Sequence, residues 1–228
     1  MNLLAIETST ESCSVALYHA GATLERSELA PRRHAELVLP MADALLAEAG
    51  LRRRQLDAIA VGRGPGAFTG VRLAVSLAQG MALGLDLPVV PVSSLAALAF
   101  DAPDDGAAVL AVIDARMGEV YAAGYRRESA TSLRPILHEC VCAPDALQLP
   151  QAEAWNVIGS GWKTYSEVLS PLVSPLRWSD GECYPQARSV AILAAAEFDA
   201  GRALPPEQAL PLYLRDKVAL TLVEQRAR

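Results

Sequence analysis

The chain has 228 residues, of which 52% are hydrophobic, and its 20 basic and 26 acidic residues give a net charge of −6. This size and composition support a substantial hydrophobic core, in one large domain or two small lobes, and argue against disorder. The negative charge disfavours broad adhesion to nucleic acid or to an anionic membrane. We therefore expect any contact with RNA to be local or to depend on a partner.

The first residues, MNLLAIETSTESCSV, contain no basic segment followed by a long apolar run. No stretch reaches the ~20 apolar residues of a membrane span, so we expect a cytoplasmic protein without a membrane partner. The four cysteines, Cys13, Cys140, Cys142 and Cys183, are too few and too irregularly spaced for a disulfide framework. We interpret them as reduced thiols in the core.

Apolar runs in the first part of the chain predict three short strands, over residues 3–6, 13–18 and 23–29, that form a meander. A helix over residues 34–49 follows, because apolar side chains recur there at helical spacing and Gly50 ends the pattern. The order continues with a strand over 57–61, a glycine-rich turn, a helix over 70–84 and a strand over 89–92.

A polar stretch over 101–106, rich in turn-forming residues, is the candidate boundary between two lobes. Beyond it the pattern repeats: a strand over 109–113 ends at Asp114, as the first strand ends at Glu7, and another strand runs over 119–125. A strand over 155–158 then enters a second glycine turn, and a helix over 190–198 closes the second copy. The sequence therefore predicts an α/β protein of two lobes, 1–105 and 106–228, each with the order βββαβα.

Acidic residues at equivalent strand ends are expected to face a common cleft between the lobes. The layout resembles that of the actin, Hsp70 and sugar-kinase superfamily, in which turns from both lobes hold a nucleotide, although a shared fold leaves activity open. Glu7 and Asp114 could coordinate Mg²⁺ there, but a carboxylate that accepts hydrogen bonds from backbone N–H groups is the commoner role. The residues of this candidate, vestigial nucleotide cleft are Glu7, Thr8, Ser9, Asp114, Gly159 and Gly161.

The glycine-rich turn before the helix over 70–84 is a further candidate for phosphate binding. A P-loop is excluded, because neither of the two lysines, Lys163 and Lys217, follows such a turn. A dinucleotide fingerprint is satisfied loosely, but the proline in the turn and the opening meander disfavour it. We interpret the turn as structural, because its glycines suit a positive φ or the close approach of another group. Its residues are Gly62, Gly64, Pro65, Gly66, Thr69 and Gly70.

The helix that follows is polar along one narrow stripe only, formed by Arg72, Ser76 and Gln79. A helix with so little polar surface is expected to be nearly surrounded by protein. Its alanines recur every four residues and form a seam of small side chains that another helix could approach closely: Ala74, Ala78 and Ala82.

Metal and catalytic chemistry find little support in the sequence. His19, His34 and His138 never stand four residues apart, so no pair can bind a metal from one helix face. We expect no catalytic residue, no metal and no cofactor, with weak binding of ATP or ADP left open. Arginines at 32–33 and 52–54 flank the first helix and are interpreted as helix-end charges, with a local RNA or protein contact as the alternative.

Five stretches together resemble the bacterial TsaB (YeaZ) family. They are IETS at 6–9, HAELVLP at 34–40, GRGPGAFTGVR at 62–72, IDARMGEVY at 113–121 and PLYLR at 211–215. The resemblance covers nearly the whole chain and implies a two-lobed, actin-like fold of the ribonuclease H-like kind. It also implies a noncatalytic part in forming threonylcarbamoyladenosine next to the anticodon of tRNA, as a partner of the transferase TsaD and of the ATPase TsaE.

In that family the two long helices of the first lobe bind TsaD, which here implies the helices over 34–49 and 70–84. Without TsaD the same faces are expected to form a homodimer, and tRNA is expected to be reached mainly through the complex. The implied partner-binding residues are His34, Leu37, Val38, Met41, Leu45, Val71, Arg72, Ala74, Val75, Ala78, Met81 and Ala82.

A hypothesis from another class of function is an ATP-dependent, kinase-like enzyme that uses the cleft between Glu7 and Asp114. A metalloprotease is a third hypothesis, which the lack of a histidine pair disfavours. The sequence leaves open which residues meet TsaE or tRNA, and whether the segment 211–215 packs on its own lobe or on the first.

Overall fold

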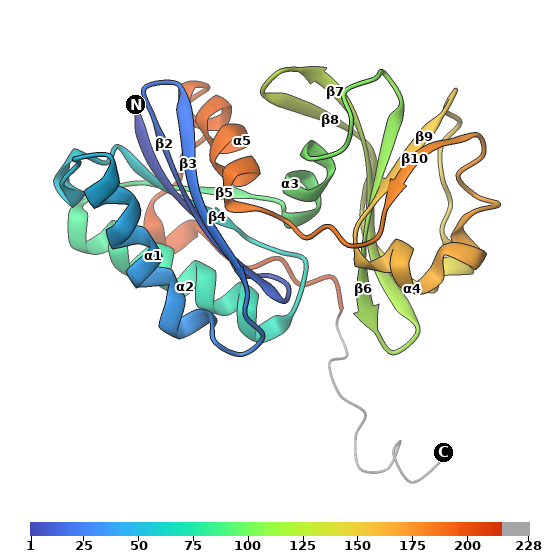
Figure 1. The fold of residues 1–228 in the computed structure, drawn as a ribbon, viewed down its shortest axis with the longest axis horizontal. Coiled ribbons are helices and arrows are strands. Elements are labelled where there is room, and N and C mark those ends of the chain that lie inside the picture. Colours follow the sequence, from blue (N-terminus) through green and yellow to red (C-terminus); the bar gives the residue numbers. More distant parts are fainter. Residues whose placement is uncertain (216–228) are drawn as a thin grey trace, which may run out of the picture.

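Two five-stranded sheets stand at the centres of two lobes in the computed structural model of the chain, which describes residues 1–215 (Figure 1). In the first sheet the central strand β1 pairs antiparallel with β2 and parallel with β4. The strand order is β3-β2-β1-β4-β5. The strands of this sheet are β1 (Asn2–Glu7), β2 (Ser12–His19), β3 (Ala22–Leu29), β4 (Ala58–Gly62) and β5 (Val89–Val92).

The second sheet repeats the same arrangement, with the order β10-β9-β6-β7-β8 and β6 in the central position. This repetition confirms the predicted duplication of the sheet. The second copy differs in one element, because a short 3₁₀ helix, Pro144–Ala146, stands where the first lobe has a long helix. The strands are β6 (Ala108–Arg116), β7 (Glu119–Ser129), β8 (Ser132–Cys142), β9 (Trp155–Ile158) and β10 (Leu176–Asp180).

Three helices of the described residues cover the first sheet. The helices α1 (His34–Glu48) and α2 (Phe68–Leu85) lie side by side on one face, over a core that includes Leu4, Ile6 and Val61 (Figure 1). The helix α5 (Ala187–Asp199) covers the other face and packs across β1, β2, β4 and β5. The first sheet is therefore buried on both faces, which explains the almost uniformly apolar sequences of β1 and β4.

The position of α5 corrects one prediction. The sequence pattern assigned this helix to the second lobe, whereas its side chains join the core of the first. Its face is built from small residues, among them Ala187, Ala191 and Ala194, and these meet alanines of the first sheet. Helical periodicity identified an apolar face but carried no information on which sheet that face covers.

The helix α3 (Ser94–Phe100) lies between the lobes and joins their cores. Leu95 and Leu98 pack into the core of the second lobe, and Ala97 packs into that of the first. The hydroxyl of Ser93 caps the helix by accepting a hydrogen bond from the Ala96 N–H (3.1 Å). On the far face of the second sheet, α4 (Ser160–Leu169) covers a further core around Trp155. Short 3₁₀ helices at Arg53–Gln55 and Pro206–Gln208 complete the described elements.

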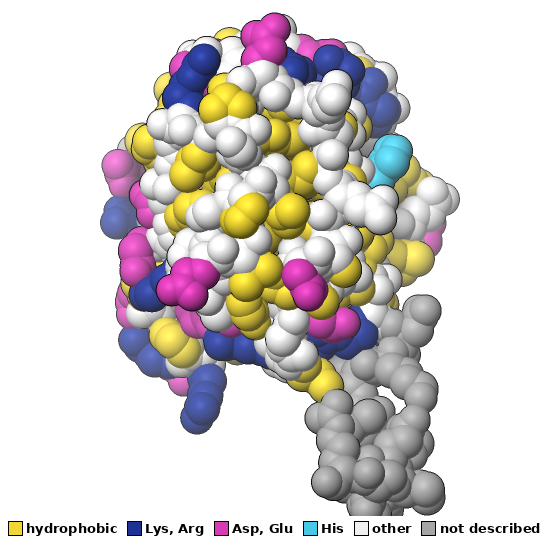
Figure 2. Space-filling view, turned by 90° about the vertical axis from the view of Figure 1, so that its right-hand side faces the viewer, with side chains coloured by type: hydrophobic (Ala, Val, Ile, Leu, Met, Phe, Trp, Pro, Cys, Tyr) yellow, Lys and Arg dark blue, Asp and Glu magenta, His cyan; other side chains and the backbone are white. Residues whose placement is uncertain are grey.

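The hydropathy of α2 bears on the expected absence of a membrane span, and the outer end of the second lobe shows how charges are distributed there. Within residues 1–215, α2 alone has the length and mean hydropathy (1.3 over 18 residues) of a membrane span, contrary to the expectation that no stretch does. Its buried residues pack on the first sheet, as those of an apolar core helix do. Figure 2 shows the outer end of the second lobe, where charged side chains of both signs mix with dispersed apolar ones.

Candidate functional site

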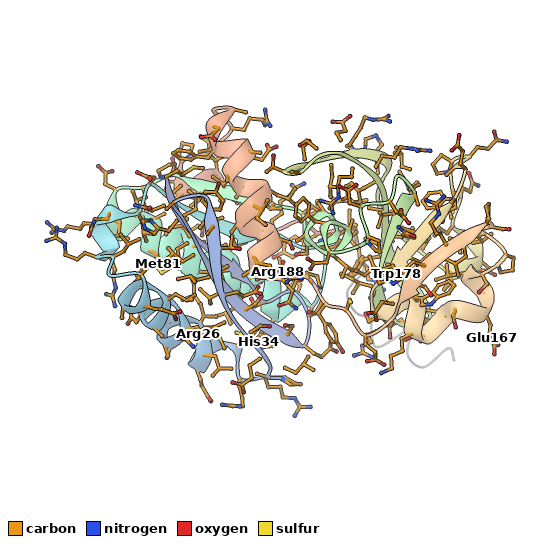
Figure 3. All side chains as sticks on the ribbon, turned by 45° about the horizontal axis from the view of Figure 1, so that its top comes forward. Arg26, His34, Met81, Glu167, Trp178 and Arg188 are labelled. Atoms are coloured by element: carbon orange, nitrogen blue, oxygen red, sulfur yellow. The ribbon has the colours of Figure 1, made fainter. Side chains whose placement is uncertain are left out.

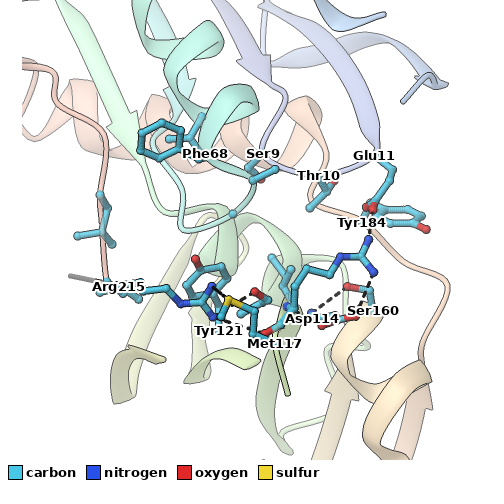
Figure 4. Close-up of a pocket in the computed structure, with 18 of the residues that line it drawn as sticks. Ser9, Thr10, Glu11, Phe68, Asp114, Met117, Tyr121, Ser160, Tyr184 and Arg215 are labelled. Atoms are coloured by element: carbon cyan, nitrogen blue, oxygen red, sulfur yellow. Dashed lines mark hydrogen bonds and ion pairs between the residues drawn. The ribbon is translucent and has the colours of Figure 1, made fainter. Parts of the chain in front are cut away.

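A cavity of about 500 Å³ opens between the two lobes (Figure 4). The turn after β1, the start of α2, the β6–β7 turn and the start of α4 converge on it, and residues 212–215 also line it. Its walls combine polar, aromatic and aliphatic side chains. They include Ser9, Thr10, Glu11, Phe68, Asp114, Tyr121, Ser160, Lys163, Tyr184 and Tyr213.

Asp114 and Ser9 are the residues of the predicted nucleotide cleft that line this cavity. The Asp114 carboxylate accepts a hydrogen bond from the Arg116 N–H (2.8 Å) and pairs with the Arg116 guanidinium (3.4 Å). The Asp114 N–H donates to Ser160 Oγ (3.1 Å). Asp114 is therefore engaged with its own chain and holds the β6–β7 turn in place. Among residues 1–215 no three His, Cys, Asp or Glu side chains gather closely enough to hold a metal ion.

Glu7 lies away from the cavity, and this corrects the expectation that it faces the cleft. Its side chain is fully buried, and the carboxylate accepts hydrogen bonds from the Ser9 N–H (2.6 Å) and the Ser94 hydroxyl (2.7 Å). Burial raises the pKa of Glu7, and the hydrogen bonds from Ser9 and Ser94 oppose that shift. Because it accepts the hydrogen bond from Ser9, Glu7 braces the backbone after β1. Its carboxylate also fills the space where a Cβ on Gly62 would stand.

The glycines of the turn after β4 are places of close approach. A Cβ on Gly66 would overlap Ser9, and one on Gly70 would overlap the Thr8 carbonyl oxygen. Gly64 has a φ of +92°, which suits glycine, and its peptide bond to Pro65 is cis. Thr8 Oγ1 donates a hydrogen bond to the Gly70 carbonyl (2.7 Å). Of the positions expected in this turn, Thr69 is the exposed one. The turn fastens the start of α2 to the end of β1.

The second glycine turn is likewise filled by protein. A Cβ on Gly159 would overlap the Val112 carbonyl and the Leu98 side chain, and one on Gly161 would overlap Val112. Neither glycine lines the cavity, which corrects their assignment to a nucleotide cleft. Ser160, between them, is the residue of this turn that reaches the cavity.

The alanine seam of α2 faces inward. Ala74, Ala78 and Ala82 have no exposed surface and pack on the first sheet. Val75 of α2, and Val38 and Leu45 of α1, are at most 3% exposed in the same core, and Val71, 2% exposed, lies at the wall of the cavity between the lobes. These seven side chains therefore cannot contact a partner in the folded chain. The spacing showed a small-residue face, but small residues also bring a helix close to its own sheet, and that is their role here.

A different face of α1 and α2 is open to solvent. The predicted partner residues Leu37, Met41 and Met81 are half-buried and reach it, and Figure 3 shows Met81 on α2 and His34 at the start of α1. His34 Nε2 lies 3.0 Å from the Thr10 carbonyl oxygen and joins α1 to the turn after β1. We call this the helical face, and it comprises Leu37, Met41, Ala44, Leu73, Ser76, Leu77, Gly80, Met81 and Gly84.

Two glycines on the helical face were missed by the sequence analysis. A Cβ built on Gly80 or Gly84 meets no atom within 4 Å, so both positions are open. With Ser76 they form an exposed line of small residues at i, i+4, i+8 spacing. A signal was available, because a glycine inside a helix lowers its stability and calls for a reason.

The polar stripe of α2 also proves to be partly covered. The Gln79 side chain donates to the Ala209 carbonyl (3.0 Å), and Arg72 Nε donates to the Tyr213 hydroxyl (2.6 Å). The Arg72 guanidinium also stacks on the Phe68 ring, 3.5 Å from its centroid. Arg72 therefore serves a contact within the chain, although the sequence analysis placed it at a partner.

The two lobes with matching sheets and a cleft between them define an actin-like α/β protein. A family model described as "TsaD: tRNA N6-adenosine threonylcarbamoyltransferase" matches residues 26–220. Two relatives are each named "tRNA threonylcarbamoyladenosine biosynthesis protein TsaB". That of Haemophilus influenzae is 42% identical, over 96% of this chain and 95% of its own, and that of Escherichia coli is 40% identical, over 96% of each.

A solved structure, "YeaZ from Pseudomonas aeruginosa", is 44% identical and superposes with a TM-score of 0.86 over 93% of this chain and 99% of its own. The chain belongs to the TsaB (YeaZ) family.

Proposed function

We propose that the chain takes part in threonylcarbamoyl modification of the adenosine next to the anticodon of tRNA, as a noncatalytic subunit that binds and activates a TsaD-like transferase. The names of its relatives support the pathway. The observation that carries the proposed role is the helical face, a solvent-exposed apolar surface on two adjacent helices.

The helical face suits helix-on-helix docking. Its Leu and Met side chains are half-exposed although they are apolar, and Ser76, Gly80 and Gly84 leave room for close approach of another backbone. Leu39 and Leu83, also on α1 and α2, are 45% and 65% exposed. Covering such a surface removes ~800 Å² per partner in an ordinary specific complex. We propose that the same face forms a homodimer when the transferase is absent.

The cleft supports a noncatalytic role. Glu7 is buried against Gly62, and Asp114 is held by Arg116 and Ser160. The groups that a kinase-like site would use are thus committed to the chain's own structure.

We further propose that the chain helps to bind a TsaE-like ATPase and that it works in the cytoplasm. Because its net charge is −6, we propose that it reaches tRNA mainly through the complex.

The competing interpretation is an ATP-binding, kinase-like enzyme. Asp114 lines the cavity, as that interpretation requires. Glu7, the second of the two carboxylates that it requires, is fully buried and does not line the cavity. Calorimetric titration of the isolated chain with Mg-ATP separates the two interpretations. Tight binding that disappears in Asp114→Ala would favour the enzyme.

Reconstitution tests the proposal. A TsaD-like transferase, a TsaE-like ATPase, tRNA, ATP and a source of the threonylcarbamoyl group are mixed with or without this chain. The modified nucleoside is then measured by mass spectrometry of digested tRNA. We expect modification only in the mixture that contains the chain, and none from the chain without the transferase. Equal modification without the chain would contradict the proposal.

A further inference from the structure

The segment 209–215 returns from the second half of the chain and crosses from α2 to the second lobe. Its first contacts are with the first lobe: the Gln79 side chain donates to the Ala209 carbonyl, and the Leu212 N–H donates to the Arg63 carbonyl (2.8 Å). Tyr213 then receives the hydrogen bond from Arg72 and packs on Phe68, with 5.6 Å between the two ring centroids. This part of the segment is anchored at the start of α2.

The end of the segment is anchored in the other lobe. Arg215 forms an ion pair with Glu119 and donates hydrogen bonds to the carbonyls of Ala115 (3.2 Å) and Arg116 (3.5 Å). Arg215 Nη1 also lies 3.7 Å from the sulfur of Met117. These four partners lie in the β6–β7 turn or in the strand ends that flank it. Figure 4 shows the Arg215 side chain directed at this turn, next to Met117 and Tyr121.

The turn that Arg215 holds has an unfavourable backbone. Arg116 and Met117 have φ values of +62° and +58°, in the left-handed region that favours glycine, and Gly118 follows at +79°. The register of β6 against β7 shifts between Asp114 and Arg116, so a bulge precedes the turn. A backbone of this kind persists where its surroundings hold it, and such segments are often found at switches.

The same turn makes the second link across the cleft. The Arg116 guanidinium reaches Glu11 in the first lobe (2.8 Å), beside the cavity that both residues line. We propose that residues 209–215 form a latch that, through Arg72–Tyr213 on one lobe and Arg215 on the other, holds the β6–β7 turn and keeps the cleft closed. Release of either end of the latch opens the cavity between the lobes. This inference does not depend on the proposed function.

Hydrogen–deuterium exchange on the full chain tests the latch, because each anchor can be cut separately. Arg215→Gln removes the side chain that holds the turn, and Arg72→Gln weakens the anchor on α2 by removing the hydrogen bond to Tyr213. If the segment links the lobes, each variant speeds exchange at both ends. Arg215→Gln should accelerate residues 66–73, and Arg72→Gln should accelerate residues 114–121, by about threefold or more.

Arg202→Gln is the matched control, because Arg202 pairs with Glu197 (2.5 Å) near the same end of the chain but within the first lobe. It should leave both segments unchanged. Glu119→Gln weakens the Arg215 anchor from the other side and should reproduce Arg215→Gln if that variant folds poorly. Acceleration confined to the segment that each arginine touches, or no acceleration in either segment, would overturn the latch.

Discussion

Substituting alanine for Gly62 and for Gly80 makes the same chemical change in opposite surroundings. At Gly62 the new Cβ overlaps the buried Glu7 carboxylate, which must then leave the hydrogen bonds from Ser9 (2.6 Å) and Ser94 (2.7 Å). Losing two such bonds while the carboxylate stays buried costs about 3–5 kcal/mol. At Gly80 no atom lies within 4 Å of the new Cβ, so alanine in this helix should stabilise the chain by about 0.5–1 kcal/mol.

Urea unfolding at low protein concentration measures both effects. Far-UV circular dichroism follows both lobes, whereas fluorescence follows the second lobe, which contains Trp155, Trp162 and Trp178. We expect Gly62→Ala to lower the midpoint of the dichroism transition and Gly80→Ala to raise it. A cost below about 1 kcal/mol for Gly62→Ala would refute the tight packing of Glu7 on Gly62. A destabilising Gly80→Ala would contradict the openness of the helical face.

Two further predictions concern ionisable groups. Because burial raises the pKa of Glu7 above its ordinary 4.5, the folded chain holds this proton more tightly than the unfolded chain does. The stability that results is fully present below pH 4.5 and is lost as the pH rises through the folded-state pKa, so Glu7→Gln should gain stability relative to wild type between pH 4.5 and 8. A constant difference across that range, in urea midpoints, would count against the burial of a titrating Glu7. Burial also raises the pKa of the Cys13 thiol to about 11 and that of Cys183 to about 12. Both should therefore react with iodoacetamide at pH 8 at least about tenfold more slowly in the folded chain than in urea, as peptide mass spectrometry can measure. Equal rates would contradict the burial of Cys13 and the partial burial of Cys183.

Much of the fold follows from local patterns in the sequence. The apolar runs and glycine turns identified β1–β7, β9, α1, α2 and α5, because central strands and amphipathic helices have distinct periodicities. The elements that the patterns missed, β8, α3, α4 and β10, are short or half-exposed, so they give a weak periodic signal. The return of α5 to the first lobe depends on contacts distant in sequence, which periodicity does not encode.

For the site residues too, local patterns were predicted correctly, whereas contacts between residues distant in sequence were not. That Ala74, Ala78 and Ala82 share a face was correct geometry, but whether a partner or the chain's own sheet covers that face depends on how far α2 is rotated about its axis. Glu7 ends its strand as predicted, yet the hydroxyl that binds it, that of Ser94, stands 87 residues away. Arg72 was a polar residue without a local explanation, and its partner Tyr213 is 141 residues further along the chain.

The central claim is that the helical face binds a TsaD-like transferase, and Gly80→Glu tests it most directly. The position is open, so a glutamate there leaves the core intact while it places a charge in the middle of the proposed contact. Val168→Glu, at a position 42% exposed on α4, is the matched control. Sedimentation velocity of each variant with the transferase should show a complex for wild type and Val168→Glu, and at least about tenfold weaker binding for Gly80→Glu. Binding of Gly80→Glu as tight as that of wild type, with both chains folded, would contradict the claim.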